Sequence, residues 1–172
     1  VFRGDPSNVL RRFVDALEGE PENRLLFRLT ADNVLPDGWL LDQMLKTYSS
    51  SNCDILRCSA AVRGVPVGVS AELTTVAQIR EALLHCEDDY DREHVTPWIY
   101  RNRKVDEFTS ADIIVSKDLR VTIDTFTDYQ CVSSLFYGVK DPIQEPIKSL
   151  IHNSGNMPYR ARNSIASKPM TL

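Results

Sequence analysis

The chain has 172 residues, of which 42% are hydrophobic and 26% are charged, and its formal net charge at pH 7 is -4. This length can bury one hydrophobic core but is short for two ordinary domains, so we expect one compact unit. A negative chain without a large cluster of lysines and arginines is poorly suited to the phosphate backbone of nucleic acids, which excludes that class of partner.

The sequence also lacks the signals of a membrane or secreted protein. No apolar run approaches the about 18 residues that a membrane-spanning helix needs, and no secretory leader opens the chain. The four cysteines are scattered, without the paired spacing of a zinc site, and we interpret them as free thiols. We therefore expect a cytoplasmic protein that binds neither nucleic acid nor membranes.

The first half of the chain alternates helical and extended patterns. Apolar residues recur at helical spacing after Asp5-Pro6, and a short, nearly continuous apolar run follows Pro21. In chain order, the pattern predicts a helix carrying residues 9–17, a strand over 25–29 that is covered on both faces, a helix carrying 40–48 with Asp37 as its cap, a strand over 54–58, a loop over 64–68 and a further extended segment over 69–73.

The second half continues in the same way up to about residue 152. The pattern predicts a helix over 76–84 capped by Thr75, a helix within 92–102 in which Pro97 sits early or forms a kink, paired strands over 113–115 and 121–123, a helix capped by Thr127 that extends to 139, and a last helix from Asp141-Pro142 to 151. Residues 153–172 lack periodicity and are expected to form a tail or linker behind a domain over 1–152. Strands that alternate with helices indicate an α/β fold with a mainly parallel sheet and helices on both faces.

Two aspartates stand at the carboxyl ends of predicted strands, Asp32 after the first strand and Asp124 after the segment 121–123. Open α/β sheets bind their ligands at this edge. Two carboxylates at adjacent strand ends could hold one Mg²⁺ ion, which takes few protein carboxylates and keeps water or phosphate oxygens as its other ligands. The alternative is that each aspartate only caps the helix or turn that follows it.

A second group of candidate residues lies in the segment 90–97. Arg92 could pair with a carboxylate or phosphate, and His94 could donate a hydrogen bond or accept a proton near neutral pH. The alternative interpretation is the start of a helix with a solvated, charged face. Glu72, beside the predicted loop 64–68, could bind a sugar hydroxyl, although a surface strand position explains it equally well.

Taken in order, several strings in this chain resemble the cytidylyltransferase-like family that includes spore-coat polysaccharide biosynthesis proteins and, more distantly, acylneuraminate and deoxyoctulosonate cytidylyltransferases. The Arg-Glu-His-Val-Thr-Pro string at 92–97 is the most specific of them. The others are Phe-Arg-Gly-Asp at 2–5, Arg-Leu-Thr-Ala-Asp at 28–32 and Val-Thr-Ile-Asp-Thr at 121–125. The resemblance covers residues 1 to about 151.

The resemblance implies a nucleotide-diphospho-sugar transferase-like fold and transfer of a cytidylyl group from CTP to a sugar. It implies that Asp32 and Asp124 bind Mg²⁺ and the nucleotide, and it places Arg92, His94 and Glu72 on the substrate side. A homodimer is a further expectation. The last six residues resemble the entry into an aldo-keto reductase domain, which predicts such a domain fused behind this one.

The chain departs from the family pattern in ways that bear on activity. Ala31 replaces the usual glycine before the first aspartate, and Ser70 stands where relatives often have aspartate. The family's amino-terminal strand and its nucleotide-binding loop, which contains glycine and arginine, are absent from the sequence, so the fold is expected to be incomplete at its amino terminus and this chain to have little activity. Two other hypotheses remain: a non-catalytic scaffold within a fused enzyme, and a glycosyltransferase that uses a nucleotide-sugar donor.

Overall fold

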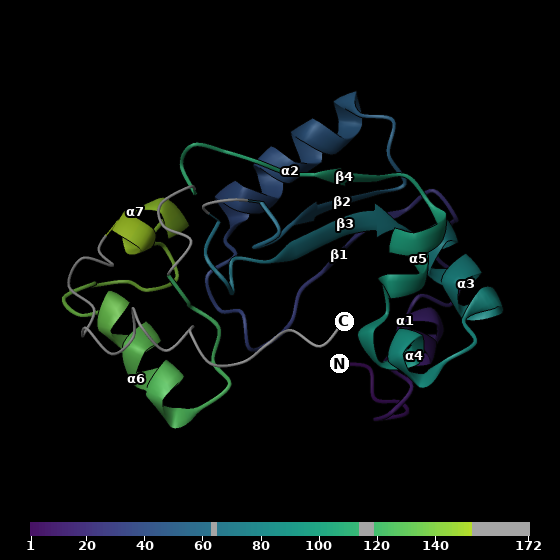
Figure 1. Ribbon diagram of the computed structural model, residues 1–172, viewed down its shortest axis with the longest axis horizontal. Coiled ribbons are helices and arrows are strands. Elements are labelled where there is room, and N and C mark those ends of the chain that lie inside the picture. Colours follow the sequence, from purple (N-terminus) through teal and green to yellow (C-terminus); the bar gives the residue numbers. More distant parts are fainter. Residues whose placement is uncertain (63–64, 114–118, 153–172) are drawn as a thin grey trace. The chain divides into compact units, whose positions relative to one another are not determined.

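The computed structural model describes residues 1–62, 65–113 and 119–152 (Figure 1). The chain has a mixed α/β fold with an open four-stranded sheet of order β1-β3-β2-β4. The elements are α1 Val9–Ala16, β1 Leu25–Arg28, α2 Gly38–Ser50, β2 Ile55–Cys58, β3 Ala71–Thr75, α3 Val76–His85, α4 Asp89–His94, α5 Pro97–Asn102, β4 Val105–Glu107, α6 Phe126–Leu135 and α7 Ile147–His152. Within these described ranges, no helix is long and apolar enough to span a bilayer.

The pairing of β1 with β3 corrects one detail of the sequence prediction. The two strands are antiparallel, and their register runs from Leu25 opposite Thr75 to Arg28 opposite Glu72. Because β1 is an edge strand of the sheet, its residues are exposed or half-buried rather than covered on both faces. The α/β class is confirmed, while this strand pair departs from the parallel arrangement that its apolar run suggested.

The contacts within the chain divide it into two compact units. The first unit comprises Val1–Arg28, Leu45–Arg57 and Glu72–Asp106, and the second comprises the described parts of Leu29–Met44, Cys58–Ala71 and Glu107–Leu172. Each of the two units thus draws on three separate stretches of the predicted domain 1–152.

The core of the first unit lies among its short helices and β2. Figure 1 shows α1, α3, α4 and α5 gathered together, as their mutual contacts also indicate. Each of three helices starts at a side chain that accepts a hydrogen bond from the backbone of its first turn: Asn8 for α1, Thr75 for α3 and Asp88 for α4. The fully buried side chains of this core are Leu10, Ile55, Ile79, Ala82, Val95 and Ile99.

The predicted helix within 92–102 is broken into α4 and α5. Val95 has φ 74° and ψ -53°, and the amide of Thr96 donates to the carbonyl of His94 at 2.9 Å, which defines a tight γ-turn. Pro97 then occupies the first turn of α5, where its missing N–H leaves no hydrogen bond unmade. The expectation that Pro97 sits early in a helix is confirmed, and the turn at Val95 is the additional feature.

Helix starts in the second unit differ from prediction at two places. Asp37 caps α2 as expected, since one carboxylate oxygen accepts from the amide of Leu40 at 2.8 Å, and its other oxygen accepts from the amide of Ile147 at 2.7 Å. Helix α7 therefore begins at Ile147 rather than at Asp141-Pro142. Helix α6 is capped by Thr125 and not by Thr127.

The segment 121–123 does not form a regular strand. It is held by isolated bridges, with Thr122 opposite Asn33 and Arg120 opposite Val67. Its predicted partner strand over 113–115 lies mostly outside the described residues, as do part of the loop 64–68 and the tail 153–172. The bridges still give 121–123 an extended course, so alternate residues face the same side.

Candidate functional site

The two aspartates predicted to form a metal site belong to adjoining segments of the second unit. The amide of Ile123 donates to the carbonyl of Asp32 at 2.9 Å, and the hydroxyl of Thr122 donates to Asp32 Oδ2 at 3.2 Å. Thr122 and Asp32 are 90 positions apart in the sequence. Asp124 is two residues beyond Thr122. The structure thus brings together the two segments that carry the acidic residues, and we refer to Asp32, Arg120, Thr122 and Asp124 as the acidic junction.

Arg120 supplies the positive charge of the acidic junction. Its guanidinium forms an ion pair with Asp124, whose side chain is about half exposed, and it approaches Asp128 Oδ1 at 3.6 Å. Arg120 and Thr122 are alternate residues of the extended segment, and Asp124 follows in the turn that leads into α6. The segment therefore presents a cation, a hydroxyl donor and a carboxylate in sequence.

Asp128 fixes the chain just after the acidic junction. Its carboxylate accepts from the amides of Asp124 and Thr125, and Thr125 in turn caps the first turn of α6, forming a reciprocal capping box. Burial opposes ionisation of Asp128, but these hydrogen bonds and the nearby Arg120 outweigh it and lower the pKa of the carboxyl. Asp124 thus lies in a turn whose backbone is held by the hydrogen bonds of the Asp124 and Thr125 amides to Asp128.

Glu72 lies in a buried polar cluster of the first unit. Its Oε2 accepts from Arg28 at 3.1 Å, and both of its carboxylate oxygens lie within 3.2 Å of the hydroxyl of Thr96. The hydroxyl of Tyr100 also donates to Oε1. Glu72 is only 8% exposed. Its carboxylate is therefore engaged by three protein side chains from β1 and the α4–α5 segment, and it anchors that segment to the sheet.

Tyr100 is held in its neutral form by this cluster. Burial raises the pKa of the phenol well above its ordinary value, and the neighbouring Glu72 carboxylate raises it further. The Arg57 guanidinium lies over the ring, 4.7 Å from its centroid. A neutral phenol is a hydrogen-bond donor, which is what the charged Glu72 carboxylate requires.

Arg92 and His94 are on α4, in the same unit as Glu72 but with different partners. Arg92 pairs with Asp89 at 2.8 Å and donates to the carbonyl of Glu87. The ring of His94 packs against that of Tyr90, with centroids 4.4 Å apart. Arg92 also borders a hollow of about 420 Å³ lined by Pro6, Ser7, Asn8, Asp89 and Glu93. A small anion that enters this hollow would compete with Asp89 for the guanidinium.

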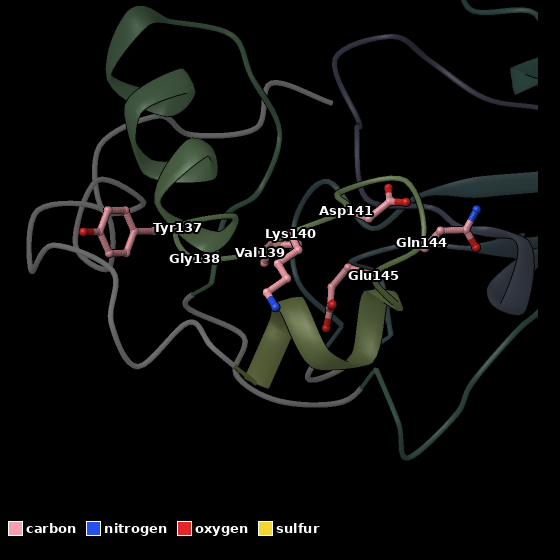
Figure 2. A pocket seen from close by; sticks show the side chains of 7 residues that line it. All are labelled: Tyr137, Gly138, Val139, Lys140, Asp141, Gln144 and Glu145. Atoms are coloured by element: carbon pink, nitrogen blue, oxygen red, sulfur yellow. The ribbon is translucent and has the colours of Figure 1, made fainter.

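Another hollow, of about 550 Å³, follows the end of α6 in the second unit. Figure 2 shows the side chains that line it, from the residues that connect α6 to α7. They are Tyr137, Gly138, Val139, Lys140, Asp141, Gln144 and Glu145. None of the residues that the sequence nominates for chemistry is among them, so this hollow is separate from the predicted site residues.

Sequence reasoning missed the partners of the site residues. Arg28 and Thr96 stand inside two of the strings that carry the family resemblance, but their contact with Glu72 depends on tertiary packing, including the register of β1 and β3, which no local pattern reveals. Arg120 and Thr122 had a detectable signal, since both alternate with Asp124 along an extended segment. That alternation could have nominated them.

The sequence was compared with known proteins and with models of protein families. The chain is 31% identical over 133 residues to an uncharacterized protein of Methanocaldococcus jannaschii, a match that covers 76% of the chain and 53% of that protein. It is 29% identical over 141 residues to the spore coat polysaccharide biosynthesis protein SpsF of Bacillus subtilis, covering 79% of the chain and 56% of SpsF. No protein-family model matches the sequence.

One solved structure has a similar fold. A cytidylyltransferase from Leptospira borgpetersenii superposes with a TM-score of 0.76 at 27% sequence identity, covering 88% of this chain and 64% of that chain. The chain is therefore cytidylyltransferase-like in both sequence and fold. Among curated proteins it is related to SpsF, and it spans about half the length of the curated relatives it matches.

Proposed function

We propose that the native polypeptide carrying this sequence transfers a cytidylyl group from CTP to a sugar and releases pyrophosphate. The observation that carries the proposal is the meeting of the Asp32 and Asp124 segments in a chain with a cytidylyltransferase-like fold. The similarity to SpsF supports a sugar destined for a polysaccharide as the acceptor.

The acidic junction has the donor chemistry that a divalent cation needs. Asp32 and Asp124 would hold Mg²⁺ through hard carboxylate oxygens, which this ion prefers. The ion would neutralise charge that develops on the phosphate oxygens of CTP. Thr122 orients Asp32 by its hydrogen bond, and Arg120 pairs with Asp124 and balances its charge.

The first unit supplies the groups proposed for the substrate side. Arg92 would release Asp89, which is a fully exposed partner, and bind an anionic group of the substrate at its hollow. His94, on the same helix as Arg92, would donate a proton to the substrate or accept one from it. Glu72 would act by holding Thr96 and Tyr100 in place, because its carboxylate oxygens already accept hydrogen bonds from three side chains.

The proposal is tested by assaying the native polypeptide for pyrophosphate release from CTP and Mg²⁺ with a panel of neutral and acidic sugars. Asp32→Asn removes one negative charge from the acidic junction with little change of shape. Asp42→Asn is the matched control, since Asp42 is an exposed carboxylate on α2 of the same unit. We expect the first variant to lose activity by roughly 10²-fold or more, as removal of a preorganised charge typically does, and the control to keep it.

The outcomes separate the competing functions. A scaffold would show no difference between Asp32→Asn and wild type in nucleotide-sugar output. A glycosyltransferase would consume a nucleotide-sugar and glycosylate an acceptor without releasing pyrophosphate from CTP. Either result would overturn the proposed cytidylyl transfer.

A further inference from the structure

Gly68 occupies a position that no other residue type can fill without moving the backbone around it. Its φ is +101°, in the region that L side chains rarely adopt. A Cβ at this position would lie 2.3 Å from the amide nitrogen of Thr122 and 2.6 Å from the carbonyl carbon of Val121. Both neighbours are backbone atoms, so no side-chain rotation can relieve the overlap.

The close approach arises because the segment that carries Thr122 runs between two others. On one side, the amide of Val121 donates to the carbonyl of Val67 at 2.7 Å, and the amide of Val67 donates to the carbonyl of Leu119 at 3.1 Å. On the other side, Thr122 forms an antiparallel bridge with Asn33. The extended residues 120–123 therefore lie between the segments of Val67 and Asn33.

This packing connects Gly68 to the acidic junction. Thr122, whose backbone touches Gly68, donates its hydroxyl to Asp32, and Ile123 donates its amide to the carbonyl of the same residue. A shift of residues 121–122 away from Gly68 changes both hydrogen bonds, and it also moves Asp124, two positions further along. One atom added at Gly68 thus acts on both aspartates.

We propose that Gly68 is a positioning residue for the acidic junction: its missing Cβ lets residues 120–123 approach closely enough to align Thr122, Asp32 and Asp124. The proposal rests on the proposed function, in that the aligned carboxylates are those assigned to cytidylyl transfer. Gly68 itself touches neither substrate nor cation. Its effect reaches the reaction through the backbone of Val121 and Thr122.

The size of the effect follows from the overlap. Gly68→Ala must open the 2.3 Å contact to at least 3.0 Å, a displacement of roughly 0.7 Å, because real Cβ contacts do not fall below that limit. Misplacement of catalytic groups by about 1 Å can reduce the rate roughly 10²-fold. We expect kcat to fall by that order.

Gly138 provides a matched control within the same unit. It too has a positive φ, +79°, but a Cβ there would meet no atom of the described residues within 4 Å. Gly138→Ala therefore imposes the same kind of backbone strain without the steric overlap. Both variants should lose some stability, and only Gly68→Ala should lose alignment of the acidic junction.

The experiment measures amide hydrogen exchange at Ile123 together with kcat for wild type, Gly68→Ala and Gly138→Ala. The proposal predicts that exchange at Ile123 accelerates at least about tenfold in Gly68→Ala, equivalent to about 1.4 kcal/mol of lost protection, and stays unchanged in Gly138→Ala. Unchanged exchange in Gly68→Ala, or accelerated exchange with full kcat, would overturn it.

A second variant keeps the test decisive if Gly68→Ala does not fold. Thr122→Val removes the hydroxyl that donates to Asp32 and adds no atom near Gly68; undiminished kcat in this variant would overturn the proposed link between the glycine and the aspartate. Failure of the proposed function is a separate result, because it would appear as no pyrophosphate release by wild type, while the exchange at Ile123 needs no substrate.

Discussion

The hydrogen bond from Tyr100 to Glu72 allows a test of the polar cluster in the first unit. Tyr100→Phe removes one hydroxyl and keeps the ring, so packing beneath Arg57 is retained. Glu72 keeps Thr96 and Arg28 as partners and is not left as a bare buried charge. The variant therefore measures a single hydrogen bond to a charged acceptor, which is worth about 1.5–3 kcal/mol. We expect the free energy of unfolding at pH 7 to fall by about 2 kcal/mol.

The raised pKa of Tyr100 sets the direction in which its contribution to the free energy of unfolding changes with pH. Burial and the Glu72 carboxylate raise the pKa of Tyr100 above its ordinary value, so the folded state retains a proton that the unfolded state begins to lose near pH 10. The stabilisation is complete below pH 10 and declines above it, at up to about 1.4 kcal/mol per pH unit. At pH 11 the difference between wild type and Tyr100→Phe should shrink from about 2 to below about 1 kcal/mol.

The assay is urea unfolding of wild type and variant at pH 7, 10 and 11, followed by tryptophan fluorescence and circular dichroism. Tyr137→Phe is the control, because the Tyr137 side chain is 93% exposed and its loss should change stability by less than about 0.5 kcal/mol. Equal stability of Tyr100→Phe and wild type at pH 7 would refute the reasoning. So would a difference that stays constant from pH 7 to pH 11.

Three further predictions concern helix starts and a buried thiol. Thr125→Ala should destabilise the protein by about 1 kcal/mol in thermal unfolding through loss of the α6 cap, whereas an equal loss in Thr127→Ala would contradict the assignment. Asp37→Ala should cost more than a single cap, about 2 kcal/mol by urea unfolding, because it frees amides in both α2 and α7. Burial raises the pKa of Cys58 to about 12, so iodoacetamide at pH 8 should modify the half-buried Cys53 and Cys86 before Cys58 in peptide mapping; early modification of Cys58 would disprove its burial.

The sequence predicted the fold best where short-range signals decide the structure. The apolar spacing of α1, the Thr75 cap of α3 and the early proline of α5 each depend on residues within one or two turns, and all three were correct. The cap of α6 was misplaced by two residues, since Thr125 and Thr127 are equally good caps by type. Asp128, three residues after Thr125, was the signal that distinguishes them.

At the candidate site, local sequence patterns predict some features and miss those that depend on tertiary packing. The sequence predicted that Asp32 and Asp124 stand at the ends of adjacent strands. The structure joins their two segments through the bonds of Thr122 and Ile123 to Asp32, although 121–123 is not a regular strand, and the roles of the carboxylates remain predictions. The approach of Gly68 to Thr122 could not be foreseen, because it depends on tertiary packing. The glycine resembles any other turn glycine in the sequence.

The γ-turn at Val95 places two opposing demands on a single position. Replacement by glycine would relieve backbone strain of roughly 1–3 kcal/mol, yet it would also remove a fully buried isopropyl group whose transfer from water is worth about 1.5–3 kcal/mol. The cavity that glycine leaves and its greater backbone freedom in the unfolded chain add to the cost of the exchange. The buried isopropyl group therefore outweighs the relief of strain, and valine stabilises the core at a backbone conformation that favours glycine.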